Sequence, residues 1–276
     1  MHEQLTNVYH IYYTPEAKEV SLMFWGCNIF CKGCYCKRRI YSPMLKDFVG
    51  THLRDNYSTA GIPQTYMTMG QIFQALDELD IKDVILEGQE ACLDPHFSEI
   101  TRRLHERYNS NNILLTNLYK MPNLSHIDKV AFGIKALTPE LNLDYTGVEN
   151  TSIIKNFLDI VKSGKKTVVE SLFIPDYIYF DEIEKIAKFV SEVDKDMLFV
   201  LLPYFKAGFN PWRRPTLEEM KKAAEISKKY LNRVFHFNGD EKNLRDVISV
   251  FPDERLIEKV HRAGADKSLD DISAEA

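Results

Sequence analysis

Six short apolar segments alternate along the chain with segments that have the period of amphipathic helices. The apolar segments, each predicted to be a β-strand, are Lys18–Trp25, Asp83–Leu86, Asn112–Leu115, Lys129–Ile134, Thr167–Ile174 and Met197–Leu202. The helical segments are Met69–Asp80 with Thr68 as N-cap, Phe97–Tyr108, Thr151–Lys162, Phe180–Val193 and Thr216–Leu231. Strands that are joined through helices run parallel, because each connection crosses back to the same end of the sheet. The pattern therefore predicts an α/β protein whose parallel sheet is covered by helices.

The pattern alone does not separate an open sheet from a curled, barrel-like one. In both, ligands bind at the carboxyl ends of the strands. The chain has 276 residues, which is enough for one large domain or two ordinary ones. We predict a single catalytic domain with its lead-in over residues 1–238 and a charged C-terminal extension over residues 239–276, because the helix–strand pattern weakens after Gly239.

Composition excludes several classes of protein. Lys and Arg number 35 against 40 Asp and Glu, for a net charge of -5, which argues against broad binding to nucleic acid or to anionic lipid. No apolar run approaches the roughly 18 residues of a membrane span, and the first ten residues have no signal-peptide pattern. We therefore expect a cytoplasmic protein in a reducing compartment, with no membrane partner.

Four of the five cysteines lie between Cys27 and Cys36, directly after the first predicted strand. An odd count and this crowding argue against a disulfide framework. Cys27, Cys31 and Cys34 are separated by three and then two residues, so their thiolates can surround one small inorganic core. Thiolates are the usual ligands of iron–sulfur clusters, and three of them on a four-iron cluster leave one iron open to another ligand.

The alternatives are a structural zinc site and a redox thiol site. Zinc normally takes two separated pairs of ligands, and no second Cys-x2-Cys or His-x3-His is present. His10, His52 and Cys92 are isolated candidates, and Cys92 is more typical of a small buried apolar residue. A second cluster would need three or four further cysteines, which the chain does not have.

The Cys-x3-Cys-x2-Cys spacing after the first strand resembles the signature of the radical S-adenosylmethionine (SAM) enzymes. The resemblance implies that Cys27, Cys31 and Cys34 hold one [4Fe-4S] cluster, and that the open iron chelates the amino and carboxylate groups of SAM. In that family, electron transfer into the sulfonium releases methionine and a 5′-deoxyadenosyl radical, which abstracts a hydrogen atom. The family fold that it implies is a partial (β/α)6 barrel of the TIM type.

The second strand ends in Gly88-Gln89-Glu90, which is similar to the Gly-Gly-Glu motif of the family that binds the amino group of SAM. The second Gly of the motif is Gln89, and an ordinary strand-to-helix turn is the alternative interpretation. The resemblance predicts a larger set of SAM contacts from the cysteine loop and the strand ends. These are Gly33, Tyr35, Gly88, Gln89, Glu90, Thr116, Gly133 and Lys135.

A closer resemblance, over roughly residues 18–212, is to the glycyl-radical activating enzymes, typified by pyruvate formate-lyase activating enzyme. Matching blocks occur in one order at Phe24–Cys27, Phe132–Lys135, Glu140–Asn150 and Leu201–Tyr204, the last with Gly208. Several blocks in one order are more specific than any single motif. The resemblance implies an acidic electron donor, such as a flavodoxin or ferredoxin, and a protein substrate.

The chain also departs from that family at positions around SAM and the substrate. Gly33 replaces an aromatic residue, Leu115 and Gly133 replace Asp, Asn142 and Phe205 replace His, and Glu170 replaces Arg. These changes imply that SAM is held by a different set of contacts, and they leave the substrate open. Tyr35 and Cys36 would restore an aromatic-Cys pair if Cys36 were the third ligand, but the spacing would become Cys-x3-Cys-x4-Cys. We favour Cys34, with Cys36 as a neighbouring free thiol.

Four basic residues, Lys32, Lys37, Arg38 and Arg39, crowd the cysteine loop of an otherwise acidic chain. They are either a solvated turn or a docking site for the acidic electron donor. The function expected is that of a radical SAM oxidoreductase that abstracts a hydrogen atom, with glycyl-radical activation as the nearest analogy. The alternatives are modification of a small molecule, peptide or RNA nucleotide, and a non-catalytic iron–sulfur or zinc protein. No catalytic side chain is assigned.

Overall fold

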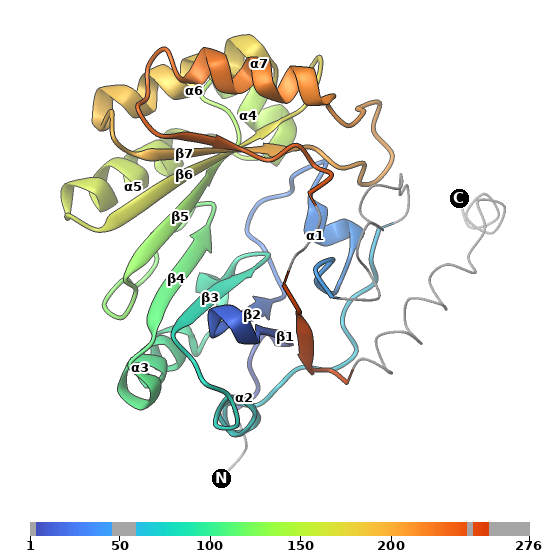
Figure 1. Ribbon diagram of the computed structural model, residues 1–276, viewed down its shortest axis with the longest axis vertical. Coiled ribbons are helices and arrows are strands. Elements are labelled where there is room, and N and C mark those ends of the chain that lie inside the picture. The colour runs from blue at the N-terminus through green and yellow to red at the C-terminus, as the bar shows by residue number, and fades with distance from the viewer. Residues whose placement is uncertain (1–3, 46–58, 242–244, 254–276) are drawn as a thin grey trace, which may run out of the picture.

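The computed structural model describes residues 4–45, 59–241 and 245–253, whose strands form one nine-stranded sheet (Figure 1). The strands are β1 Val8–Thr14, β2 Glu19–Phe24, β3 Asp83–Gly88, β4 Asn111–Thr116, β5 Lys129–Ile134, β6 Lys166–Phe173, β7 Leu198–Pro203, β8 Val234–His236 and β9 Ile248–Phe251. Their order is β8-β7-β6-β5-β4-β3-β2-β1-β9. The strands from β2 to β8 are parallel, whereas β1 is antiparallel to both β2 and β9. Because β8 and β9 stand at opposite ends of this order, the barrel is partial and open.

Helices cover the outer face of the sheet. Figure 1 shows α3, α5, α6 and α7 outside the curve, and α1 on the opposite, concave side. The helices are α1 Tyr35–Arg38, α2 Met69–Leu76, α3 Phe97–Tyr108, α4 Pro139–Thr146, α5 Thr151–Lys162, α6 Phe180–Val193 and α7 Leu217–Ser227, with short 3-10 turns at Pro15–Ala17 and Ala91–Leu93. The core lies between these helices and the sheet, where the rings of Phe132 and Phe157 stack at 5.0 Å.

The six predicted strands are β2 to β7, and they are parallel neighbours in the order of the chain. Five predicted helices are present, and two of them begin at a capping box. The hydroxyl of Thr68 accepts from the backbone N–H of Gln71, and that of Thr216 accepts from Glu219. Each cap satisfies a backbone donor that the first helical turn leaves without a partner. The helix predicted over Met69–Asp80 ends earlier than expected, at Leu76.

Five elements were not predicted: α1, β1, α4, β8 and β9. Strand β1 is aromatic and almost wholly buried, so its sequence lacks the alternation of a half-exposed strand. Strand β8 has three residues and β9 has four, which is too few for a period to be recognised. Helix α1 has four residues, which is too few for a helical period. Residues 46–58, further along the chain, lie outside the described residues.

The predicted C-terminal extension contributes to the sheet, because β9 pairs with β1. The domain boundary at residue 238 stays a prediction, and residues 254–276 of the predicted extension lie outside the described part of the chain. In the ranges that the structure describes, no helix is both long enough and apolar enough to cross a membrane.

Candidate functional site

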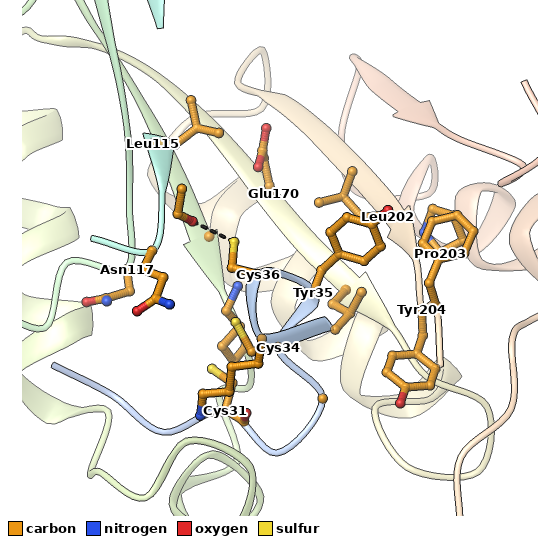
Figure 2. Close-up of a pocket in the computed structure, with 18 of the residues that line it drawn as sticks. Cys31, Cys34, Tyr35, Cys36, Leu115, Asn117, Glu170, Leu202, Pro203 and Tyr204 are labelled. Carbon is orange, nitrogen blue, oxygen red and sulfur yellow. Dashed lines mark hydrogen bonds between the residues drawn. The ribbon is translucent and has the colours of Figure 1, made fainter. Parts of the chain in front are cut away.

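A cavity of about 650 Å³ lies where the parallel strands end, at the edge of the sheet predicted to bind ligands. Every predicted site residue lines it except Glu90: Cys27, Cys31, Gly33, Cys34, Tyr35, Gly88, Gln89, Thr116, Gly133 and Lys135. These residues come from the cysteine loop, β3, β4 and β5, so the fold collects side chains that are more than a hundred positions apart. Figure 2 shows the cysteine loop on one side of the pocket, and Leu115 with Glu170 on the other.

The cysteine loop leaves β2 through Gly26, whose φ of +107° suits glycine. The loop is held from outside the sheet by α4. The backbone N–H of Phe30 donates to the carbonyl of Thr146 at 2.7 Å, and that of Lys32 donates to Tyr145 at 2.9 Å. Cys34 ends the loop as the N-cap of α1. Backbone hydrogen bonds therefore set the path of the loop, whichever side chains it carries.

All three predicted ligand thiols, Cys27, Cys31 and Cys34, are free and line the same cavity. Burial raises the pKa of the Cys31 thiol to about 12, so the thiolate needs a positive partner such as bound iron. Asn117 Nδ2 lies 3.6 Å from the Sγ of Cys27 and donates toward it. Within the described ranges, no three Cys, His, Asp or Glu side chains form a set that could hold a single metal ion. A cluster of several irons spans more space than one ion, and the donor chemistry of the loop fits such a cluster.

The fourth cysteine of the loop, Cys36, has a contact of its own. Its Sγ donates to the carbonyl oxygen of Gly88 at 2.8 Å, so its thiol lies against the end of β3 (Figure 2). Among the zinc candidates, His10 lies on β1 and donates through Nδ1 to Phe251, away from the loop. His52 lies outside the described residues.

The Gly88-Gln89-Glu90 turn packs directly on the chain that leads into the cysteine loop. A Cβ atom on Gly88, whose φ is +100°, would lie 2.7 Å from the carbonyl oxygen of Phe24, so only glycine fits. The side-chain oxygen of Gln89 accepts from the backbone N–H of Gly26 at 3.0 Å. In this chain, the residue that replaces the second Gly of the motif thus fixes the start of the cysteine loop.

Glu90 is buried behind the cavity and has three donors. Its carboxylate accepts from the hydroxyl of Thr116 at 2.8 Å, from the backbone N–H of Asn117 at 2.9 Å and from the thiol of Cys92 at 3.0 Å. Burial raises the pKa of Glu90, and these hydrogen bonds oppose that shift. The carboxylate therefore positions Thr116 and Asn117. The predicted site did not include Asn117, although the Thr-Asn pair after the third predicted strand was the available signal.

The volume beside Gly33 is filled by aromatic rings from elsewhere in the chain. A Cβ atom on Gly33 would lie 2.7 Å from Tyr204 Cε2 and 3.2 Å from the hydroxyl of Tyr145. Tyr35 makes an edge contact with Phe205 at 5.9 Å. Its hydroxyl is buried with no hydrogen-bond partner in the described ranges, and burial raises its pKa to about 12. Position 33 is therefore small because Tyr204 and Tyr145 already supply the aromatic wall.

Lys135 and Glu170 face the cavity from neighbouring strands. Lys135 Nζ lies 3.1 Å from the place of a Cβ on Gly133, and Gly133 is the partner of Glu170 in the register of β5 and β6. No hydrogen bond or salt bridge joins either charged group to another described residue. Burial raises the pKa of Glu170, and the charge of Lys135 opposes that rise.

The four basic residues near the loop differ in their accessibility. Lys32 is half exposed and forms a 2.5 Å ion pair with Asp144. Lys37 Nζ donates to the carbonyl of Cys31 at 3.5 Å, while Arg38 is buried. Only Lys32, Lys37 and Arg39 are therefore accessible to a partner.

A partial β/α barrel with a three-cysteine loop at the end of its first parallel strand defines a class of cluster-binding enzymes. The model of the Radical SAM superfamily matches residues 22–190, and the chain belongs to this superfamily. Its members are oxidoreductases that use a [4Fe-4S] cluster and SAM.

Relatives and solved structures agree with this assignment. A Methanocaldococcus jannaschii protein named "Putative glycyl-radical enzyme activating enzyme MJ1632" is 25% identical in an alignment 234 residues long, which covers 78% of this chain and 79% of that protein. Streptococcus suis SuiB bound to S-adenosylmethionine superposes with a TM-score of 0.52 at 16% identity, covering 79% of this chain and 45% of SuiB. TYW1 with a lysine-pyruvate adduct superposes with a TM-score of 0.54 at 14% identity, over 83% and 78% of the two chains. The two structures show a shared fold.

Proposed function

We propose that this protein cleaves SAM reductively at a [4Fe-4S] cluster held by Cys27, Cys31 and Cys34, and abstracts a hydrogen atom from a glycyl-radical partner protein. The observation that carries the proposal is the convergence of these three cysteines and the predicted SAM contacts on one cavity. The choice of a glycyl-radical protein as the substrate is supported by the Methanocaldococcus jannaschii relative, because the match covers 79% of that protein.

A [4Fe-4S] cluster held by these cysteines would supply the electron that cleaves SAM, and the residues of the chain would control its surroundings. Asn117 donates to the sulfur of Cys27, and a hydrogen bond to a ligand sulfur tunes the reduction potential of a cluster. Glu90 holds Asn117 in place through its backbone, and Gln89 holds Gly26. Glu90 and Gln89 therefore act on the cysteine loop through Asn117 and Gly26, as positioning residues.

SAM would lie between the cysteine loop and the ends of β3 to β5. The ammonium of Lys135 is suited to a carboxylate, because no described acceptor uses its protons. The buried hydroxyl of Tyr35 lacks a partner and could bond to the nucleoside. The rings of Tyr145 and Tyr204 are almost fully buried, and they shield this end of the cavity from water.

The deciding experiment is anaerobic reconstitution of the full chain with iron and sulfide, followed by reduction and addition of SAM. Wild type should bind about four irons and release 5′-deoxyadenosine. Cys27→Ser, Cys31→Ser and Cys34→Ser should lose both, while Cys92→Ser, which keeps a donor to Glu90, serves as the matched control. Product from Cys31→Ser at the wild-type rate would contradict the assignment. A zinc or non-catalytic protein would yield no 5′-deoxyadenosine.

The choice between Cys34 and Cys36 is decided by the same measurement. Cys34 lies at the N-terminus of α1, whereas the thiol of Cys36 is bonded to Gly88. Cys36→Ser should therefore keep the iron content of wild type. If Cys36→Ser loses the cluster and Cys34→Ser keeps it, the longer spacing is correct.

Glu170 favours a second candidate function, because it places an acid where the activating enzymes have an Arg. A radical SAM enzyme that modifies a small molecule, peptide or RNA nucleotide would share the cluster and the cavity. Electron paramagnetic resonance of a purified glycyl-radical protein after incubation separates the two. A glycyl doublet supports activation, while 5′-deoxyadenosine without a doublet supports the second function. For either function, we place the protein in the reducing cytoplasm with an acidic electron donor.

A further inference from the structure

Glu170 is a cavity-facing carboxylate that no described residue neutralises. It lies inside β6, three residues before the strand ends at Phe173. No hydrogen bond or salt bridge satisfies its two oxygens within the described ranges. Taking a carboxylate out of water is unfavourable unless a donor or a cation replaces the water. An acid that has no partner among the described residues is therefore able to bind a donor or a cation that a ligand brings into the cavity.

The walls around Glu170 are mainly apolar. The same cavity is lined by Leu115 of β4, Ala131 of β5, Leu172 of β6 and Leu202 of β7. Figure 2 shows Leu115 and Leu202 on either side of Glu170. Such walls suit a hydrocarbon chain and make a charged hydrogen bond stronger than it would be in water.

The other charged groups nearby do not serve as the partner of Glu170. The charges of Lys135 and Lys129 both oppose the rise in the pKa of Glu170 that burial causes, but neither lysine forms a salt bridge with it among the described residues. On β3, the carboxylate of Glu87 is already bonded to the hydroxyl of Tyr12 at 2.5 Å. Glu241, which also lines the cavity, accepts from the backbone N–H of Gly239 at 2.9 Å. Among the described acids of the cavity, Glu170 is therefore the one without a hydrogen-bond donor.

We propose that Glu170 binds a cationic group of the substrate, an ammonium or guanidinium carried on an apolar stem that packs against Leu115, Leu172 and Leu202. This inference rests on the proposed radical SAM function and names the chemistry of its substrate. The cation is the side chain of a Lys or Arg in a polypeptide or a free aliphatic amine. Both sources present the same charge and a similar stem.

The depth of Glu170 separates it from Lys135 and from the cysteine loop. Lys135 follows the last residue of β5, whereas Glu170 is level with Gly133, the innermost of the predicted SAM contacts. Cys27, Cys31 and Cys34 lie beyond the strand ends. SAM held by the loop and Lys135 would therefore lie on the outer side of Glu170, with room for a substrate beside it.

The test uses reconstituted holoenzyme with SAM and equilibrium binding of defined probes. The peptides acetyl-Gly-Arg-Gly-amide and acetyl-Gly-Glu-Gly-amide form one pair, and hexylamine and hexanoate form the other. Wild type should prefer the cationic member by about tenfold, since a hydrogen bond between a cation and a carboxylate is stronger than one between neutral groups. Glu170→Gln should abolish the preference and Glu170→Lys should reverse it. Glu149→Gln, at an exposed acid outside the cavity, is the matched control.

If wild type prefers the cationic member only in the peptide pair, the source of the cation is a polypeptide. If it prefers the cationic member only in the hexylamine and hexanoate pair, the source is a small molecule. Equal binding of both members in wild type would overturn the proposal, as would a preference that survives in Glu170→Gln. A tenfold loss of SAM affinity in Glu170→Gln would show that Glu170 contacts SAM and would also overturn it. Absence of 5′-deoxyadenosine from wild type, by contrast, tests the proposed function itself.

Discussion

The carboxylate of Glu90 accepts a 2.9 Å hydrogen bond from the backbone N–H of Asn117, and the side-chain amide of Asn117 donates to the sulfur of Cys27. One buried acid thereby joins the end of β3, the end of β4 and the cysteine loop. Glu90 does not line the cavity, so in this chain the acid of the Gly-Gln-Glu turn supports the wall behind the site.

Removal of the Glu90 carboxylate should destabilise the protein strongly. Glu90→Ala leaves three buried donors without an acceptor, so we expect a loss of about 2–4 kcal/mol in the free energy of unfolding. Urea titration of the apo protein measures this loss, with Glu149→Ala as the exposed control. A loss below about 1 kcal/mol would show that water replaces the carboxylate.

Gly88 tests whether the turn after β3 requires glycine. Gly88→Ala combines a positive φ with a Cβ atom 2.7 Å from the backbone of Phe24, so it should cost about 3 kcal/mol or more in stability. Gly164 also has a positive φ, but its Cβ would meet no atom within 4 Å. Gly164→Ala should therefore cost only about 1 kcal/mol. Equal costs in thermal or urea unfolding would mean that the crowding at Phe24 is relieved.

Gly33 and Tyr204 should behave as a coupled pair. Gly33→Ala places a methyl group against the Tyr204 ring, which we expect to cost about 1–3 kcal/mol and to lower the yield of 5′-deoxyadenosine. Tyr204→Leu removes the opposing ring atom. In a double-mutant cycle, the cost of Gly33→Ala should be smaller by about 1 kcal/mol or more in the Tyr204→Leu background. Additive effects would refute the coupling.

His10 should make the stability depend on pH. Burial lowers its pKa from 6.5 to about 4, and its Nε2 has no partner within the described ranges. The unfolded chain therefore binds more protons between pH 4 and pH 6.5, so stability rises across this window and is level above it. The loss on acidification should reach about 3 kcal/mol and should be absent in His10→Gln. Urea unfolding at several pH values across that window measures this loss. If the free energy of unfolding of His10→Gln changes with pH as steeply as that of wild type, His10 is not the cause.

Lys32 and Lys37 should affect the rate of turnover only when an acidic protein is the reductant. Lys32→Ala with Lys37→Ala removes two accessible cations beside the cysteine loop, so turnover driven by flavodoxin should fall about tenfold at low salt. Turnover driven by dithionite should remain unchanged, as should both rates in the exposed control Lys221→Ala. Equal slowing with both reductants would mean that the substitutions damage the loop.

Local sequence patterns determined the architecture of this protein. The apolar segments that became β2 to β7, and the caps at Thr68 and Thr216, depend on neighbours within a few residues. The resemblance to the radical SAM superfamily also came from local patterns. These were the spacing of Cys27, Cys31 and Cys34 and the order of the matching blocks. Strand β1 was not predicted because it is almost wholly buried between its partners β2 and β9, and that burial depends on the tertiary structure.

Only the tertiary structure decided what the site residues touch. Glu90 turned toward Thr116 and Asn117 because the ends of adjacent parallel strands meet at one edge of the sheet. The room beside Gly33 was filled by Tyr204, which is 171 positions away in the sequence. Whether a charged side chain is paired depends on such distant contacts, so the chain alone could name Glu170 as a departure, and its lack of a partner emerged only from the fold.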